Sequence, residues 1–323
     1  MRNPYLTIWP ATLALFVVSP LIAPGSLSLG ALQGSLPFAA ILAIVGIGQT
    51  LVIQQRGLDL SVPGVVSLAA SIVVLMPSST GLGLPVAIVV ALAVSALAGL
   101  VSGIAVTRLG ITPLVATLAV NALLLGTLLQ ITRGGADGTA TPSLTKFAIG
   151  RVAGIPNVLL VAIAMTVLVA LFVRVTRTGR TFVAVGTSTA AGTAAGMPVR
   201  RYTLATYVVA SSLYGLAGIL LAGYLRTPGL TVGDSYLLPS IAAVVLGGTS
   251  LAGGAGSVVA TGAGALFLTQ LQQVVFAAGA PTSVQLIIQS GVIGIGMAVR
   301  TVPWRRWFGR RGGRSVIAVA TTR

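Results

Sequence analysis

The side chains that most often perform chemistry in proteins are nearly absent from this chain of 323 residues. It contains no His, no Cys and no Glu, and its acidic residues are Asp59, Asp137 and Asp234. Without thiolate or imidazole ligands, we expect no metal site. Without His, Cys or Glu, no set of nucleophile, base and acid can be assembled. The sequence therefore argues against an enzyme and against a metal centre.

The same absences argue against ATP hydrolysis and proton transport by this chain. The only lysine is Lys146, and no glycine-rich phosphate-binding loop precedes it, so the P-loop of ATPases is missing. The three aspartates fall at the ends of predicted spans or in a loop, whereas proton-driven transporters relay protons through acidic or His side chains inside the membrane. Sodium coupling through unwound backbone carbonyls and hydroxyl groups needs no acid and stays open.

Amide side chains are the main polar groups within the apolar segments. An amide buried in lipid must find a hydrogen-bond partner, so it either joins neighbouring helices or lines a polar pathway. Joining is the commoner role of any single amide, but amides and hydroxyls without charges would suit a neutral, hydroxylated solute better than an ion. The candidate pathway residues are Gln49, Asn121, Gln130, Gln270, Gln273 and Gln289.

Membrane-spanning helices must position these groups. Hydrophobic residues make up 55% of the chain and charged residues 7%, which is more apolar surface than a soluble core can hide. We therefore predict an all-α, polytopic membrane protein. Since a span needs roughly 20 apolar residues, we expect about ten spans, at 6–23, 35–54, 61–76, 84–106, 111–131, 156–173, 203–225, 235–250, 256–277 and 283–300.

Three of these predicted spans have an alternative interpretation. The third and the eighth are short and begin beside an Asp and a Pro, so each could be re-entrant or broken. The first could be a signal peptide, but we expect a retained span because no A-x-A cleavage site follows it and many spans come after it.

The basic residues predict the orientation of the chain in the membrane. The net charge is +16, and the basic residues lie at the edges of apolar runs, which the positive-inside rule explains without a nucleic-acid partner. With a cytoplasmic N-terminus, ten crossings place 15 arginines inside and 4 basic residues outside. We predict cytoplasmic N- and C-termini, a transmembrane domain over 1–302 and a basic cytoplasmic tail over 303–323.

The stretch TGRTFVAVGTSTAAGTAAGMPVRRY at 178–202 has an uncharged middle between two arginine clusters. Its core has no Leu or Ile and carries five hydroxyl residues, so we expect a cytoplasmic helix over about 180–200. Gly186, Ala190, Thr193 and Met197 recur at helical spacing and predict a small-residue face that a partner's backbone can approach closely. The alternative is a helix lying on the lipid surface, which would favour bulkier apolar side chains.

Two segments share a pattern of Asp and Ser followed by Pro, QQRGLDLSVPGVVSLAA and VGDSYLLPSIAAVVLGG. Asp59 or Ser61 can cap a helix that has Pro63 in its first turn, and a second helix would begin at Asp234 with Pro239 in its first turn. In the predicted topology the two segments start on opposite faces of the membrane, as an inverted repeat requires. Chance recurrence of helix caps is the alternative.

Four segments carry a resemblance to a known family. RGLDLSVPGVVSLAAS resembles the GIDLSVG segment of the ribose-type permeases of bacterial ABC importers, and TPLVATLAVNALLLGTLLQITRG resembles their P-x-hydrophobic-T-L-x-T segment. IAAVVLGGTSLAGGAGSVVAT is close to their AIAAVVLGGTSLxGGxG signature, and GRTFVAVGTSTAAGTAAGMPVRRY resembles their cytoplasmic coupling helix. The likeness covers about 36 to 300. Departures are Pro63, where the family usually has Gly, and Ser188 and Thr189, where it has acidic or amide residues.

The resemblance implies the permease subunit of an ABC importer in a bacterial inner membrane, moving a sugar or related neutral polyhydroxylated solute inward. It implies a second permease subunit, an ABC ATPase subunit that binds ATP-Mg, an extracytoplasmic solute-binding protein and surrounding lipid, with no cofactor held by this chain. Import of a branched-chain amino acid or a nucleoside on the same scaffold is an alternative, as is a stand-alone secondary transporter or channel.

The resemblance also assigns residues to roles. The coupling helix, seated in the ATPase subunit, would use Arg180, Phe182, Gly186, Ala190, Ala191, Gly196 and Met197. The structural motifs comprise Asp59, Ser61, Pro63, Asp234, Gly247, Gly248, Gly253 and Gly254.

Overall fold

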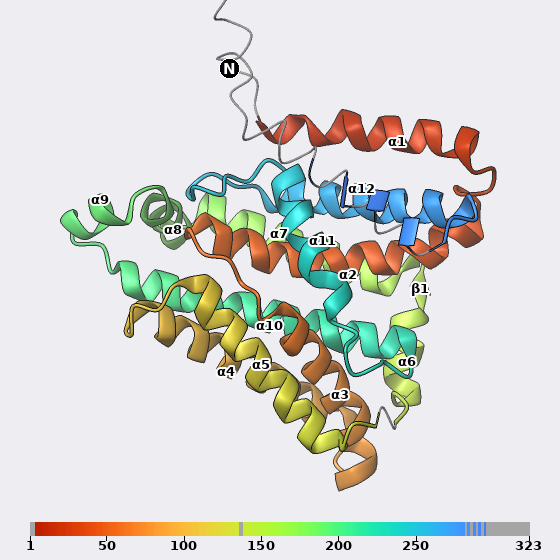
Figure 1. Cartoon of the computed structure of the whole chain (residues 1–323), viewed down its shortest axis with the longest axis horizontal. Helices are drawn as coiled ribbons and strands as arrows, with labels where there is room; N and C mark the ends of the chain where they lie inside the picture. Colours follow the sequence, from red (N-terminus) through yellow and green to blue (C-terminus); the bar gives the residue numbers. More distant parts are fainter. Residues whose placement is uncertain are drawn as a thin grey trace, which may run out of the picture.

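The computed structural model describes residues 4–135 and 138–281, together with 283, 284, 287, 288, 290, 291 and 294. The described chain is mostly helical (Figure 1). Its elements, in chain order, are η1 (Pro4–Leu6), α1 (Ile8–Ile22), α2 (Leu29–Gln54), α3 (Val62–Thr80), α4 (Leu84–Thr107), α5 (Pro113–Thr132), α6 (Pro142–Ile149), β1 (Arg151–Val152), β2 (Ile155–Pro156), α7 (Asn157–Val175), α8 (Arg177–Thr187), α9 (Thr189–Ala194), α10 (Val199–Leu225), α11 (Asp234–Leu246) and α12 (Val258–Ala277). Strands β1 and β2 form an antiparallel hairpin with Val152 paired to Ile155.

Seven helices in the described part of the chain are long and apolar enough to cross a membrane: α2, α3, α4, α5, α7, α10 and α12. The chain is therefore a multi-pass membrane protein. Each of the first nine predicted spans coincides with a helix, but α1 and α11 have only 15 and 13 residues. Most of the tenth predicted span and the whole predicted basic tail lie outside the described residues.

Helices α2 and α10 form the centre of the bundle. Every residue of α2 from Ala39 to Gln54 is buried, and α10 packs against α2, α3 and α4. Small residues make this packing close, because a Cβ on Gly48 would touch Ala210 and Tyr214, and one on Gly99 would collide with the backbone of Tyr207. Such contacts let helix backbones approach in a membrane, where packing rather than the hydrophobic effect joins helices.

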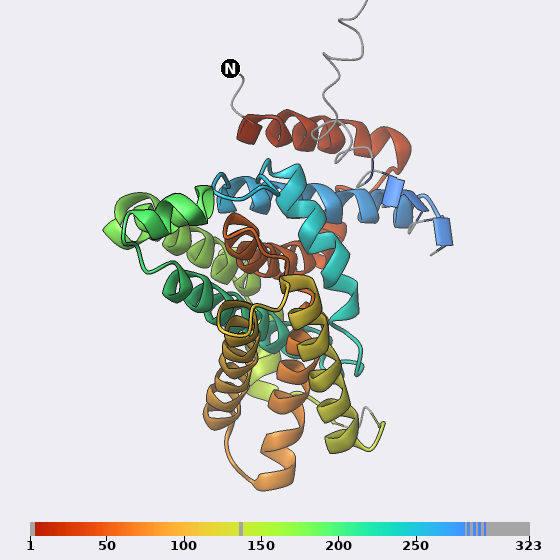
Figure 2. The same cartoon turned by 60° about the vertical axis from the view of Figure 1, so that its left-hand side comes forward.

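The helices lie along and across the long axis of the molecule. In Figure 1, α2, α10 and α12 run along it, with α8 and α9 at one end and β1 and α6 at the other, while α3, α4 and α5 are inclined to them. Helix α1 is outermost, beside α12, in both views (Figure 1; Figure 2). Helices α4, α5 and α7 keep large apolar side chains exposed, including Leu97, Leu118 and Leu168, as expected of surfaces that face lipid or another subunit.

Helices α3 and α11 begin next to each other inside the bundle. The backbone N–H of Gly233, which precedes α11, donates to Ser67 Oγ of α3 at 3.0 Å. A Cβ on Gly233 would collide with the backbone of Pro63, so only glycine permits this approach. From this point the two helices diverge (Figure 1). That the two segments start on opposite faces of the membrane, as an inverted repeat requires, stays a prediction.

Candidate coupling site

The predicted single helix over about 180–200 is two helices, α8 and α9. Thr176 caps α8, because its Oγ1 accepts from the Gly179 N–H at 2.9 Å. Ser188 ends α8 with an extended backbone and caps α9, accepting from the Ala191 N–H at 3.2 Å. A serine hydroxyl offers backbone N–H groups a partner outside the regular helix. The expected continuous helix is corrected to a helix pair joined at Ser188.

One face of α8 is buried against the end of α2. Phe182, Val185 and Gly186 are buried, and Gln55 Nε2 donates to the Phe182 carbonyl at 2.8 Å. A Cβ on Gly186 would collide with the carbonyl oxygen of Gln54. The small residue at this position therefore serves packing within this chain, and the prediction that Gly186 offers its face to a partner is corrected.

Arg56, directly after α2, binds the C-terminal end of α8. Its Nε donates to the Gly186 carbonyl at 3.1 Å, and its Nη2 donates to the Thr187 carbonyl. The last carbonyls of a helix lack intrahelical partners and carry partial negative charge, so a cation is favoured there. Arg56 has a positive φ of 63°, a backbone conformation that costs energy in a residue other than glycine. Its two contacts with α8 offset that cost.

The glycine-rich loop between α11 and α12 reaches the same place. The Gly254 N–H donates to the Gln54 carbonyl at 2.9 Å, and Gln54 Nε2 donates back to the Gly254 carbonyl at 3.4 Å. Gly253 and Gly254 have φ values of 89° and 74°, and a Cβ on either would collide with Arg56 or Thr187. The glycine signature is thus required by close packing against α2 and α8.

These contacts define one cluster, which we call the α2–α8 junction. It comprises Gln54, Gln55, Arg56, Phe182, Gly186, Thr187, Gly253 and Gly254. The other predicted glycines of the signature lie just before it: Gly247 packs against α12 at Ala260 and Thr261, and Gly248 has a φ of 90°. The junction ties α2, α8 and the loop before α12 into one unit.

Helix α9, in contrast, has small side chains that are exposed at the surface of the chain. Ala190, Ala191 and Gly196 are exposed, whereas Met197 is half-buried. Gly192 is the buried residue of α9, facing Val185 and Val199. Arg180 is exposed on α8 and donates to the Val175 carbonyl at 2.9 Å. The predicted coupling residues therefore fall into two groups. Phe182 and Gly186 are buried against α2, whereas Arg180 and the residues on and after α9 are exposed or half-buried.

The connection between α2 and α3 is held by side chains of three helices. Gln49 of α2 donates through Nε2 to the Asp59 carbonyl at 3.3 Å, and Tyr214 of α10 donates to Gln49 Oε1 at 2.9 Å. Thr117 of α5 accepts from the Leu60 N–H at 2.9 Å. This connection directly follows Arg56 of the α2–α8 junction. The hydrogen bonds that hold it therefore also fix the start of α3 relative to the junction.

The predicted capping residues of α3 and α11 behave differently. Pro63 lies in the first turn of α3 as predicted, and Ser61 is the N-cap, but no side chain makes the predicted capping hydrogen bond there. Asp59 Oδ1 instead accepts from the N–H and the Oγ of Ser61, at 2.9 and 2.6 Å. Asp234 is the first residue of α11, after a Gly233 N-cap. Pro239 is the sixth residue of α11, so the prediction that it lies in the first turn is wrong.

The predicted pathway amides do not line one channel in the described chain. Three of them join elements: Gln49 as above, Asn121, which accepts from the Gly64 N–H at 2.7 Å, and Gln270, which donates to Ser19 of α1 at 3.1 Å. Gln130 is exposed and Gln273 is half-buried, while Gln289 lies outside the described residues. Joining helices is the role that the geometry gives to the buried Gln49 and Gln270 and to the half-buried Asn121.

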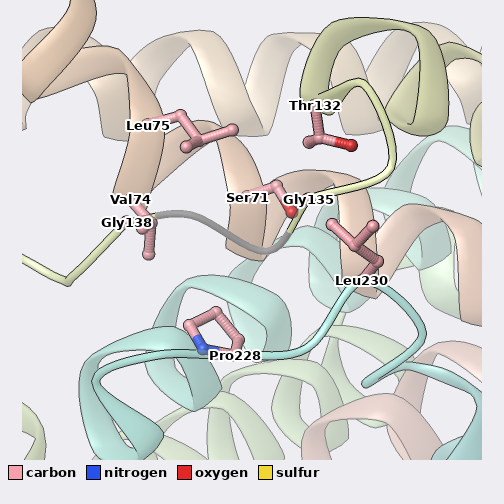
Figure 3. A pocket seen from close by; sticks show the side chains of 8 residues that line it. All are labelled: Ser71, Val74, Leu75, Thr132, Gly135, Gly138, Pro228 and Leu230. Atoms are coloured by element: carbon pink, nitrogen blue, oxygen red, sulfur yellow. The ribbon is translucent and has the colours of Figure 1, made fainter.

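A cavity of about 250 Å³ near the start of α11 was not predicted from the sequence. Its polar lining includes Ser235, Tyr236, Thr269 and Gln272. The small pocket in Figure 3, between α3 and the loops after α5 and α10, has a volume of about 10 Å³, which is room for about one water. Of these two, only the cavity beside α11 has room for a solute. Its residues come from α2, α10, α11, α12 and the loop before α11, and no short motif marks such a combination.

Comparisons with known proteins identify the family. Residues 31–296 match the model of the branched-chain amino acid transport system / permease component family. The chain belongs to this family. It is 33% identical to the probable ABC transporter permease protein y4mJ of Sinorhizobium fredii, over 90% of this chain and 85% of that protein. It is also 33% identical to the ribose import permease protein RbsC of Escherichia coli K12, over 88% of this chain and 89% of that protein.

A third relative extends the range of named solutes. The autoinducer 2 import system permease protein LsrD of Photorhabdus laumondii is 31% identical over 81% of this chain and 80% of that protein. Comparison with solved structures gives no match. The resemblance found in the sequence motifs is confirmed, and the relatives named here are permeases.

Proposed function

We propose that this chain is the membrane permease subunit of an ABC importer that moves a sugar or a related neutral, polyhydroxylated solute into a bacterial cell. The relatives named for ribose and autoinducer 2 import support this solute class. The observation that carries a coupling function is the α2–α8 junction, because it fixes α8 to the transmembrane bundle while α9 stays open for a partner.

The distribution of basic residues supports a cytoplasmic position for α8 and α9. One end of the bundle carries the arginines at the junction, at the ends of α4 and α7 and around α8: Arg56, Arg108, Arg174, Arg177, Arg180, Arg200 and Arg201. The opposite end, where the Ala140 N–H donates to the Arg226 carbonyl at 2.8 Å, carries Arg133, Lys146, Arg151 and Arg226. By the positive-inside rule the first end faces the cytoplasm, in an inner membrane and with cytoplasmic termini.

In this proposal the chain supplies the pathway and a separate subunit supplies the energy. An ABC ATPase would bind ATP-Mg and seat α9, a second permease subunit would complete the pathway, and an extracytoplasmic binding protein would deliver the solute. The chain itself would hold no cofactor, as expected of a sequence without a P-loop lysine.

The second candidate is import of a branched-chain amino acid, which the description of the matched family favours. A zwitterionic amino acid would need charged or strongly dipolar partners along its path. The cavity beside α11 instead presents a hydroxyl, a phenol and an amide from Thr269, Tyr236 and Gln272, groups that hydrogen-bond sugar hydroxyls. This lining favours the neutral solute.

Reconstitution tests the proposal. The permease, its ATPase and its binding protein are placed in proteoliposomes, and uptake of labelled ribose, leucine and adenosine is measured with ATP or a non-hydrolysable analogue. We expect ATP-dependent uptake of the sugar and no ATPase activity from the permease alone. Uptake without the ATPase would favour a secondary transporter, and ATP-dependent uptake of leucine instead of sugar would favour the second candidate.

A further inference from the structure

An open apolar crevice lies between α7 and α10, close to the arginine-rich end of the bundle. Its volume is about 520 Å³, within the range of about 300 to 1,000 Å³ that is typical of ligand pockets. Its walls are apolar side chains of α7 and α10, and Phe182 of α8 borders it. The wall residues used below are Val169, Phe172, Ala205 and Val209.

One cation borders this apolar space. Arg201 lines the crevice and is exposed. The acidic residues in the described part of the chain lie elsewhere, since Asp59 is buried and accepts from Ser61, and Asp234 is at the start of α11. The described part of the chain therefore offers Arg201 no carboxylate there, and an anion from outside would complement its charge.

We propose that this crevice binds an anionic phospholipid, with one acyl chain between α7 and α10 and the phosphate bound by Arg201. A planar guanidinium suits a phosphate group because it can donate two parallel hydrogen bonds. The surface potential of the anionic cytoplasmic leaflet attracts such lipids to basic residues. An anionic phospholipid combines a long apolar chain for the crevice with an anionic phosphate at the membrane surface for Arg201.

The bound lipid would contact the α2–α8 junction directly. Phe182 borders the crevice, and its backbone carbonyl accepts from Gln55 at 2.8 Å. An acyl chain packed on Phe182 would hold α8 against α2. The lipid site uses the membrane orientation of the proposed function but neither the ATPase nor the solute, so loss of lipid binding would leave the transport proposal standing.

Lipid titration followed by native mass spectrometry tests the headgroup contact. The purified permease is titrated with phosphatidylglycerol or with phosphatidylcholine of the same acyl chains. We expect one saturable site that prefers phosphatidylglycerol. Arg201→Gln should weaken phosphatidylglycerol binding about tenfold or more, the usual size of a charge-assisted hydrogen bond, and should leave phosphatidylcholine binding unchanged.

Arg200→Gln is the matched control, because Arg200 is also exposed but does not line the crevice. It should weaken phosphatidylglycerol binding by no more than about fivefold, the general effect of one basic residue near an anionic surface. Equal losses in the two variants, or no saturable site in the unmodified permease, would overturn the proposal.

A second pair of variants tests the acyl-chain position. Ala205 is exposed within the crevice, so Ala205→Phe should fill it and reduce binding of both lipids. Val167, exposed on α7 but outside the crevice, gives the control Val167→Phe, which should bind both lipids normally. If Ala205→Phe instead leaves lipid binding intact and dissociates a permease dimer, the occupant is a second copy and the lipid proposal is wrong.

Discussion

Helices α8 and α9 follow each other directly in the sequence, yet small residues have opposite roles in them. In α8, Gly186 has no side chain because the Gln54 carbonyl occupies that space. In α9, Ala190 and Ala191 are exposed and contribute an unobstructed surface. A small residue therefore marks close packing within the chain in the first helix and an open face in the second. The same substitution should give different results in the two helices.

Replacement of Gly186 should produce the largest loss of stability. Gly186→Leu places a side chain where the Gln54 carbonyl lies, and that oxygen cannot move without disturbing the end of α2. Overpacking usually costs about 1 to 3 kcal/mol and more when the backbone must shift, so we expect at least about 3 kcal/mol. Thermal unfolding of the purified permease measures the change.

Gly126→Leu is the control for this variant. Gly126 is inside α5, and a Cβ there would have no neighbouring atom within 4 Å. Its unfolding temperature should stay near that of the unmodified permease. If Gly186→Leu unfolds like the control, α8 is not packed against α2 as described, and the contrast between the two helices disappears.

Replacement of Arg56 should have a smaller effect, confined mostly to α8. Arg56→Gln removes the cation that donates to the Gly186 and Thr187 carbonyls. Hydrogen bonds from a charged group contribute about 1.5 to 3 kcal/mol when buried, and less at this partly exposed position, so we expect a loss of about 1 to 2 kcal/mol. Hydrogen exchange should accelerate at the amides of α8 and not at those of α10.

Arg56→Lys keeps the positive charge near the end of α8 and should recover part of the loss. It should recover only part, because a lysine presents its donors from one nitrogen and cannot match both carbonyls as the guanidinium does. Exchange in α8 that is the same in Arg56→Gln, Arg56→Lys and the unmodified chain would contradict a role for Arg56 in anchoring the helix.

Sequence patterns predicted where the helices lie along the chain better than they predicted which helices pack against each other. Apolar runs predicted nine of the described helices, because burial in a bilayer imposes length and composition on each span. The predicted ends differ from the observed ones by up to six residues, at the start of α2. The apolar runs did not predict that α3 and α11 begin side by side, since this depends on Gly233 meeting Pro63 across 170 residues of chain. A periodicity reports which residues share a face, but not what that face contacts.

The α2–α8 junction was likewise predicted only in part from the sequence. The motifs placed Gly253, Gly254 and the stretch around Gly186 in functional segments, and the structure brings both to the α2–α8 junction. Gln54, Gln55 and Arg56 were missed as parts of it. Their signal was present in the three consecutive polar residues QQR at the end of an apolar span, but a polar end of a span is expected at any membrane surface.

Replacement of Ala190 should have the smallest effect on the permease itself and should test the open face of α9. Since Ala190 is exposed, Ala190→Leu should leave thermal unfolding within about 0.5 kcal/mol of the unmodified chain. If an ATPase groove fits closely over α9, the added side chain should weaken docking by about 1 to 3 kcal/mol, or about five- to 150-fold. Co-purification of the ATPase with the permease measures this.

Ala190→Ser is the matched control, because a serine keeps the surface small and should retain the ATPase. A helix that only lies on lipid predicts another result, since an added leucine strengthens contact with a membrane surface. In that case both variants would co-purify with the ATPase equally well, and Ala190→Leu would bind liposomes more tightly. That outcome would remove α9 from the coupling proposal while leaving the packing of α8, which depends only on contacts within this chain, unchanged.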